Sequence, residues 1–117
     1  MSESNVTISV QPGPEAYIVV VSGRVDSSNA NELDTILQQL IKDDHEKLVI
    51  QLTDVVYMSS AGLRAIVSAL REVKKKRGGD VRIAAPSQRV SEVFALAGLN
   101  PLFQTFDDVE TAVASFD

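Results

Sequence analysis

Two adjacent serines, Ser59 and Ser60, are the residues of this chain with the clearest potential for chemistry. They follow an apolar stretch and precede apolar residues at helical spacing, so they fall at the predicted start of a helix. Unpaired backbone N–H groups and the positive end of the helix dipole make such a start favourable for a phosphate. A serine hydroxyl there can cap the helix, contact a phosphate or be phosphorylated, and the residue types alone leave these three roles open.

No catalytic set accompanies the two serines. His45, the only histidine, precedes the predicted strand at 47–52, which places it roughly 20 Å from Ser60 and out of reach as a general base. The sequence has no cysteine, no H-x-x-x-H motif and neither of the common glycine-rich nucleotide loops. It therefore predicts a protein that is not an enzyme and that carries no cofactor.

Several carboxylates lie near predicted helix starts, namely Asp26, Asp54, Asp107 and Asp108. Together they could hold a cation at one end of the molecule. Carboxylates at helix starts usually act as caps, however, so we favour capping and expect no metal site.

Composition and charge narrow the class of protein. A chain of 117 residues with 44% hydrophobic and 23% charged residues is an ordinary folded mixture, and we expect residues 1–117 to form a single domain. The net charge of −5 and the small number of aromatic residues disfavour a nucleic-acid partner. The one basic run, at 74–77, precedes Gly78 and fits the end of a helix. Residues 1–4 do not resemble a signal peptide, and no apolar run could span a membrane, so we expect a cytoplasmic protein without a membrane partner.

Apolar periodicity gives the order of elements. Helical spacing of apolar residues predicts helices within 33–41, 63–73, 90–97 and 109–116, the last with Asp107 and Glu110 at capping-box spacing. Strands are predicted at 6–10, 16–21, 47–52, 81–85 and 102–106. The short turn at 11–15 can only return the chain antiparallel, whereas the later strands alternate with helices. The expected fold is α/β, in the order β-β-α-β-α-β-α-β-α, with helices on a mainly parallel mixed sheet.

In such a sheet the carboxyl ends of the parallel strands gather at one rim, where ligands usually bind. The loops at 23–26, 54–60, 86–87 and 107–108 should meet there. The sequence thus predicts that Asp26 and Asp54 share this rim with the two serines.

A longer motif around the serines resembles a known family. The stretch Tyr57-Met58-Ser59-Ser60-Ala61-Gly62-Leu63, preceded by Leu52-Thr53-Asp54, is similar to the signature of STAS domains, and more narrowly to that of bacterial anti-sigma factor antagonists. The phosphorylation loop of that family usually reads Asp-Ser-Ser/Thr-Gly-Leu at a helix start. Two further elements, Gly23-Arg24-Val25-Asp26 and Ala97-Gly98-Leu99, also resemble the family. The resemblance extends over nearly the whole chain and implies the STAS fold.

When the motif is aligned on Gly62 and Leu63, the phosphorylated serine of the family falls on Ser60, with Ser59 as the alternative. The chain has Ser59 where the family has aspartate and Ala61 where it has a second hydroxyl residue. A serine can replace aspartate as a cap, whereas the missing negative charge bears on how a kinase handles the site. Gly62 should permit close helix–strand packing or close approach by a partner. The residues expected to bind the partner or form the phosphate loop are Asp26, Asp54, Met58, Ser59, Ala61, Gly62, Leu63 and Arg64.

The resemblance implies a switch between partners. An unmodified antagonist binds an anti-sigma factor, typically a serine kinase of the histidine-kinase-like ATPase class, and so frees a sigma factor. Phosphorylation at Ser60 releases the antagonist, and a serine phosphatase restores it. Two alternatives remain: a STAS subunit of a transporter or sensory assembly, or a small phosphate- or nucleotide-binding enzyme. The absent phosphate loop and the distant His45 count against the enzyme.

Overall fold

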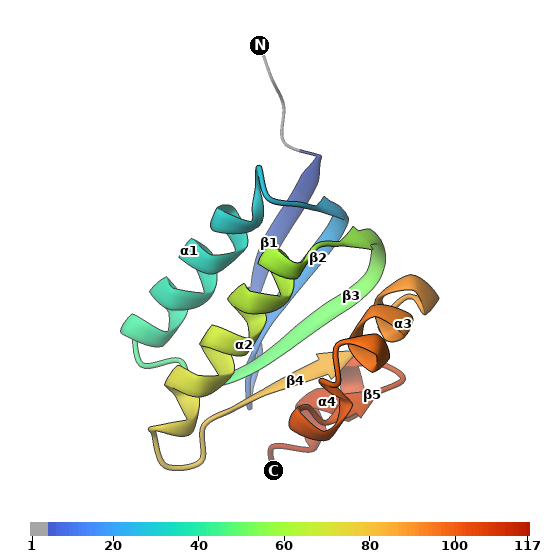
Figure 1. Cartoon of the computed structure of the whole chain (residues 1–117). Coiled ribbons are helices and arrows are strands. Elements are labelled where there is room, and N and C mark those ends of the chain that lie inside the picture. Colours follow the sequence, from blue (N-terminus) through green and yellow to red (C-terminus); the bar gives the residue numbers. More distant parts are fainter. Residues whose placement is uncertain (1–4) are drawn as a thin grey trace.

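The computed structural model describes residues 5–117 and confirms the expected order of elements (Figure 1). The expectation that residues 1–4 hold no signal peptide lies outside the described residues. The strands are β1 (Val6–Pro12), β2 (Tyr17–Val25), β3 (Lys47–Met58), β4 (Asp80–Ala84) and β5 (Thr105–Phe106). The α-helices of this part are α1 (Ala30–Lys42), α2 (Ser60–Lys74), α3 (Gln88–Leu96) and α4 (Val109–Ala114), with a 3-10 turn at Asn100–Leu102.

The strands form one sheet in the order β1-β2-β3-β4-β5. β1 is antiparallel to β2 at one edge, and the other three pairings are parallel, as expected from the short first turn. The parallel strands β2 to β5 lie side by side in the sheet in the same order as in the sequence. Crossovers between such strands are nearly always right-handed, so α1, α2 and α3 lie on the same face of the sheet.

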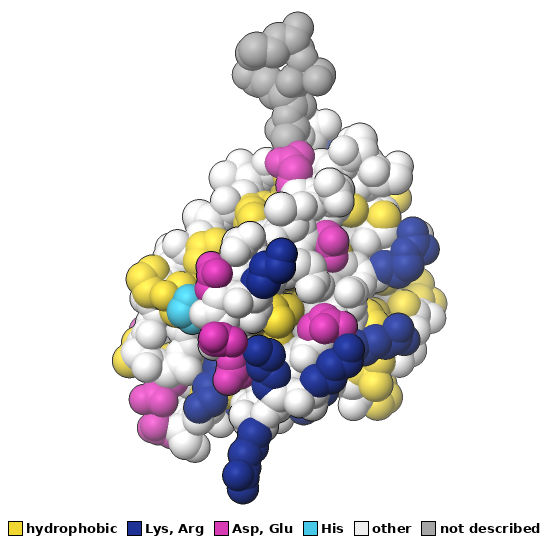
Figure 2. Space-filling model, turned by 90° about the vertical axis from the view of Figure 1, so that its left-hand side faces the viewer, with side chains coloured by type: hydrophobic (Ala, Val, Ile, Leu, Met, Phe, Trp, Pro, Cys, Tyr) yellow, Lys and Arg dark blue, Asp and Glu magenta, His cyan; other side chains and the backbone are white. Residues whose placement is uncertain are grey.

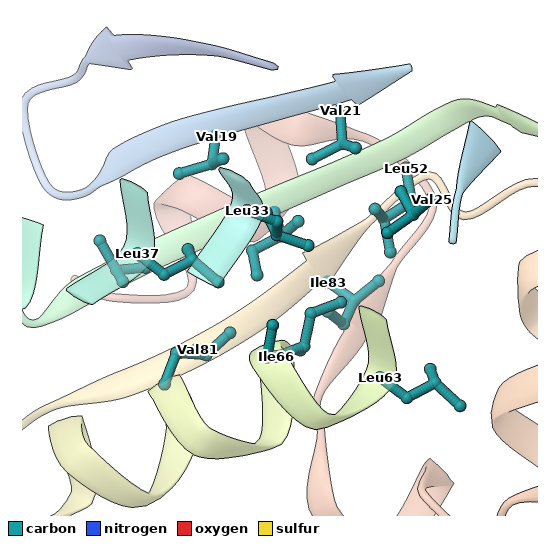
Figure 3. Packing of buried hydrophobic residues seen from close by; sticks show 14 of the residues in the cluster. Val19, Val21, Val25, Leu33, Leu37, Leu52, Leu63, Ile66, Val81 and Ile83 are labelled. Atoms are coloured by element: carbon teal, nitrogen blue, oxygen red, sulfur yellow. The ribbon is translucent and has the colours of Figure 1, made fainter. Parts of the chain in front are cut away.

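The main hydrophobic core lies between these helices and the sheet (Figure 3). Leu33 and Leu37 of α1 and Ile66 of α2 are fully buried there, together with valines of β2 and β4. The apolar stripes predicted from spacing are therefore the core faces of the helices. α4 packs on the opposite face, where Ala112 belongs to a second, smaller cluster with residues of β3 and β4.

β2 and β3 are longer than the sequence suggested. They were expected to end at Val21 and Leu52, but they continue to Val25 and Met58. Main-chain pairing sustains them, since the register joins Val25 to Met58 across two irregularities at which β3 carries an extra residue. The segment from Asp54 to Met58, expected as a loop, is therefore strand.

The C-terminal region also departs from expectation. The strand predicted at 102–106 is reduced to Thr105–Phe106, because the chain from Asn100 to Leu102 forms a 3-10 turn. The cap of α4 is Asp108 and not Asp107: the Thr111 backbone N–H donates to Asp108 Oδ1 at 2.7 Å. The capping-box assignment was thus wrong by one residue.

Charged side chains of both signs are interspersed on the face shown in Figure 2. The basic run lies at the end of α2, as expected, and its three lysines are paired. The ion pairs are Lys74–Asp80 at 3.3 Å, Lys75–Glu72 at 3.2 Å and Lys76–Asp44 at 3.1 Å. Within the described part of the chain, no helix is long and apolar enough to cross a membrane.

Candidate functional site

The candidate site lies where β3 passes directly into α2, with Ser59 as the only residue between them. Ser59 has an extended backbone, and its Oγ accepts a hydrogen bond from the Gly62 backbone N–H at 3.3 Å. The backbone N–H of Ser59 donates to the carbonyl of Val25 at 2.8 Å. Ser59 is therefore the helix cap, as expected, and it also ties the start of α2 to the end of β2.

Ser60 is the first residue of α2 and its side chain is exposed. Its hydroxyl takes part in none of the hydrogen bonds found among residues 5–117. A phosphate on this hydroxyl would sit at the positive end of the helix dipole, where a negative charge gains about 0.3–1 kcal/mol. The two neighbouring serines thus differ in what they can do: one is engaged with the backbone and the other faces solvent.

Gly62 allows α2 to approach the strand ends closely. A Cβ at this position would press on Met58 Sδ and would lie 2.7 Å from Val25 Cγ1, well inside normal contact distance. Gly62 is buried between the helix and the ends of β2 and β3. The interpretation of Gly62 as a helix–strand packing residue is therefore confirmed.

Asp26 lies beside this helix start because it follows Val25, whose carbonyl binds Ser59. Asp26 Oδ1 accepts hydrogen bonds from the hydroxyl of Ser28 at 2.6 Å and from the Ser28 backbone N–H at 2.9 Å. Both hydrogen bonds lower the pKa of Asp26 below its ordinary value, and the one from the Ser28 hydroxyl has the larger effect. The rim next to Ser60 therefore carries a negative charge at neutral pH.

Asn29 holds the Asp26 turn in place, a role that the sequence did not reveal. It stands where the cap of α1 should be, yet its side chain makes no capping hydrogen bond. Instead its Oδ1 accepts from the Asp26 backbone N–H, and its Nδ2 donates to the Arg24 carbonyl, both at 2.9 Å. The side chain is buried, with only 3% of the residue exposed. In the sequence Asn29 follows two serines, and nothing there distinguishes it from an ordinary cap.

The ends of β2 and β3 also place Arg24 against Tyr57, two residues that had no assigned role. The guanidinium of Arg24 lies 4.5 Å from the centroid of the Tyr57 ring, a cation–π contact. This pair braces the two strand ends immediately before Asp26 and Ser59. Tyr57 belongs to the motif, but only strand register brings Arg24 next to it.

Asp54 does not lie at the start of α2, contrary to the expectation from the sequence. It is exposed within β3, opposite Ser22, and four residues of strand separate it from the end at Met58. At about 3.3 Å per residue this is a distance of about 13 Å. The physical reason is the extension of β3 by pairing with β2, which turns the expected loop into strand.

The remaining motif residues divide by burial. Met58 and Leu63 are buried, with 3% and 8% of the residue exposed, and they support the helix start from beneath. Ala61 is half-buried and Arg64 is exposed. The surface available to a partner at this helix start is therefore centred on Ser60 and Arg64, with Asp26 beside them.

His45 lies at the opposite end of the sheet, where its ring stacks on Tyr17 at 3.9 Å between centroids. The 12-residue strand β3 separates it from the helix start. Such a strand spans roughly 36 Å, more than the sequence alone implied. Within residues 5–117 no cluster of three or more His, Cys, Asp or Glu side chains is arranged to hold a metal ion.

Comparisons of the sequence with known proteins agree on one family. The family model of the STAS domain matches residues 5–112. BtrV of Bordetella bronchiseptica, named as a candidate anti-sigma factor antagonist, is 28% identical over 99 residues, which are 85% of this chain and 84% of BtrV. The anti-sigma-B factor antagonist of Staphylococcus aureus is 26% identical over 106 residues, which are 91% of this chain and 97% of that protein.

Solved structures show the same fold. An anti-sigma factor antagonist from Mycobacterium paratuberculosis superposes with a TM-score of 0.87 at 22% identity, over 99% of this chain and 98% of that one. SpoIIAA of Bacillus, solved in its phosphorylated form, gives a TM-score of 0.75 at 17% identity, over 95% of this chain and the whole of the other. At these identities the likeness is one of architecture, including the element order of the sheet and helices.

Proposed function

The chain belongs to the STAS domain family, and we propose that it is an anti-sigma factor antagonist whose partner binding is controlled by phosphorylation of Ser60. The unmodified protein binds an anti-sigma factor that is also a serine kinase of the histidine-kinase-like ATPase class, and a sigma factor is thereby freed. Phosphorylation releases the antagonist, and a serine phosphatase restores it. The names of the two relatives support antagonism, and SpoIIAA in its phosphorylated form supports the modification.

The observation that carries this proposal is the division of roles between the two serines. Ser59 holds the helix start through its hydroxyl, whereas the hydroxyl of Ser60 is exposed and has no internal partner among residues 5–117. A kinase can therefore modify Ser60 without unmaking the cap. The same reaction on Ser59 would place the phosphate on the oxygen that caps α2.

The expected free energies favour a change of surface over a change of fold. A phosphate adds about −1.5 to −2 charges. At its own helix start it is mildly favourable, by about 0.3–1 kcal/mol. In a docked interface, juxtaposed like charges cost several kcal/mol, and each ~1.4 kcal/mol is a tenfold loss of affinity. The protein should therefore stay folded while its partner dissociates.

Phosphosite mapping tests the assignment. We expect mass spectrometry of the protein purified from its own cells to find phosphate on Ser60. The variant Ser60→Ala should lose the phosphate and keep the co-purified partner, whereas Ser59→Ala should keep both. Phosphate on Ser59, or retained by Ser60→Ala, would overturn the assignment. Nucleotide turnover by the protein alone would instead favour an enzyme.

A charge substitution tests the mechanism. Ser60→Asp should weaken partner binding at least tenfold, while the melting temperature changes little because the side chain is exposed. Thr35→Asp, at an exposed position of α1, is the matched control and should leave binding unchanged. Loss of stability in Ser60→Asp, or an equal loss of binding in the control, would refute release by local charge.

A further inference from the structure

A groove runs along α2 beside the segment that follows α3. Its volume is about 440 Å³. Four of its lining residues are apolar, and we call these the floor; the others are one serine and two arginines. The apolar residues are Leu63, Val67, Ala97 and Leu99, and the others are Ser68, Arg64 and Arg71.

Ser60 does not line the groove but lies on the same face of α2 as three residues that do. At about 100° per residue, Ser60, Arg64, Val67 and Arg71 all fall within an arc of about 60°. Eleven residues separate the first from the last, a rise of about 16 Å. Ser60 therefore stands at the head of a linear surface whose far end is marked by Arg71.

The two arginines are available to an outside partner. Both are exposed, and neither forms an ion pair within residues 5–117. The lysines at 74–76, by contrast, are all paired with acids. Arg64 also borders a shallower depression against α1, where the one acidic side chain, Asp34, is not paired with it. A guanidinium binds carboxylates in a bidentate manner, which makes it suited to acidic partners.

The floor is preformed, because Leu63 belongs to the main core and both Val67 and Leu99 pack against it. Apolar exposure continues beyond the groove. Leu96 and Leu102, which flank its far wall in sequence, are 89% and 52% exposed, and they are two of the four exposed large apolar side chains of the described part. Exposed large apolar side chains are often part of an interaction site.

We infer that this groove docks an acidic amphipathic helix of the partner. Apolar side chains spaced i, i+3/i+4, i+7 would lie on the floor, and the acidic side chains beside them would meet Arg64 and Arg71. The α2 residues that line the groove run from Leu63 to Arg71, a rise of about 12 Å, which matches about eight residues of a docked helix. Because the apolar floor is recessed, it fits a ridge of side chains better than a flat membrane. A second copy bound about a two-fold axis would bring the same arginines together, which like charge opposes.

The inference rests on the proposed function for its partner and adds the surface that the partner uses. It also gives a reason why phosphorylation of Ser60 would weaken partner binding. A phosphate on Ser60 would place about −1.5 to −2 charges at the head of a groove that binds an acidic helix. Repulsion between like charges would then expel the helix, in the direction required for release.

The experiment is selection from a displayed library of random 16-residue peptides against the unphosphorylated protein. Enriched peptides should be acidic, with apolar residues at helical spacing, and should perturb the amide resonances of Leu63, Val67 and Leu99. The double variant Arg64→Glu/Arg71→Glu should weaken their binding at least tenfold. Arg77→Glu, an exposed arginine beyond the end of α2, is the matched control and should change binding less than twofold.

Several results would overturn the inference. They are the absence of any enriched peptide, enrichment of basic or non-amphipathic peptides, equal binding to the double variant, and resonance changes elsewhere. Self-association in sedimentation that the double variant abolishes would assign the groove to a second copy. Binding to phosphatidylglycerol vesicles that depends on both arginines would assign it to a membrane.

No kinase and no phosphate enter the selection, so the two proposals can fail separately. If Ser60 is phosphorylated in cells but no acidic helix binds, the groove is wrongly assigned and the switch stands. If acidic helices bind at the groove but Ser60 is never modified, the switch is wrong and the docking surface stands.

Discussion

The starts of α1 and α2 are neighbours at the same rim, yet they are built in opposite ways. At the start of α1, the buried Asn29 binds two backbone groups, and Asp26 accepts two hydrogen bonds from Ser28. At the start of α2, a single hydroxyl, that of Ser59, makes the capping contact, and Ser60 beside it is exposed. One start is closed by its own side chains and the other is open to solvent.

This difference shows that residue type does not decide the role of a helix start. Both starts contain a pair of serines, at 27–28 and 59–60. At the first, the hydroxyl of Ser28 is used to fix a carboxylate, and Asn29 binds the backbone on either side of Val25. At the second, Ser60 is the first residue of the helix itself, so a phosphate on its hydroxyl would lie at the positive end of the α2 dipole.

The largest effect should come from the closed start. Asn29→Ala would leave the part-buried Asp26 N–H and Arg24 carbonyl without this side-chain partner and would remove a buried side chain, and an unsatisfied buried group costs about 1–3 kcal/mol. We expect a loss of about 2–4 kcal/mol in the free energy of unfolding, measured by urea denaturation. Asn31→Ala, an exposed position of the first turn of α1, should cost less than about 0.5 kcal/mol. Equal stability of the two variants would show that the start of α1 is not closed by Asn29.

Gly62→Ala tests how tightly the open start is packed from beneath. The added Cβ would meet Met58 and Val25, and overpacking of this kind costs about 1–3 kcal/mol. Replacing a helical glycine by alanine returns up to about 1 kcal/mol. We expect a net loss of about 1–2 kcal/mol in urea denaturation. A gain in stability would mean that the helix can move away from the strands without penalty.

Ser59→Ala should cost about 1 kcal/mol, less than either change above, because a single capping hydrogen bond is lost. Ser59→Asp keeps a capping oxygen and should restore most of that stability in the same measurement. If Ser59→Asp lost as much stability as Ser59→Ala, the capping role of Ser59 would be contradicted. Aspartate would then not serve as a cap here, although the family usually has it at this position.

The smallest expected effect is on the pH dependence of stability, through the charge of Asp26. Its pKa is lowered in the folded protein, so its stabilising contribution is present above the unfolded pKa and is lost as the pH falls through the folded value. Asp26→Asn should therefore be slightly less stable than the parent at pH 6, and the difference should shrink as falling pH protonates Asp26. Urea denaturation at a series of pH values measures it, with the exposed Asp107→Asn as control. A difference that persists in acid would show that the carboxylate charge is not responsible.

Much of this architecture was accessible from the sequence because local patterns carry it. The spacing of apolar residues gave the helices of the core, and the short turn at 11–15 required an antiparallel first strand. Ser59 was expected to cap α2 because serine precedes an apolar helical pattern there, and the structure confirms it. These inferences depend only on residues that are close in sequence.

The errors arise where distant segments decide the conformation. Asp54 interrupts an apolar run and was placed in a loop, but pairing with β2 keeps it in a strand. Asn29 resembled a cap, but its amide instead binds the backbone on either side of Val25. Either of two aspartates could cap α4, and the structure selects Asp108 over Asp107.

The helix start at Ser59 and Ser60 shows most clearly how these contributions divide. The order of residues was sufficient to place a cap and a second hydroxyl at the first turn of α2, since helix signals are local. The sequence also placed Asp26 at the rim beside them, and the Ser59–Val25 hydrogen bond agrees with that placement. Only the folded chain shows that two arginines on the same face of α2 line a groove together with apolar residues. The reason is physical: strand pairing and helix packing set the distances between segments that are far apart in sequence, and those distances determine which charges interact.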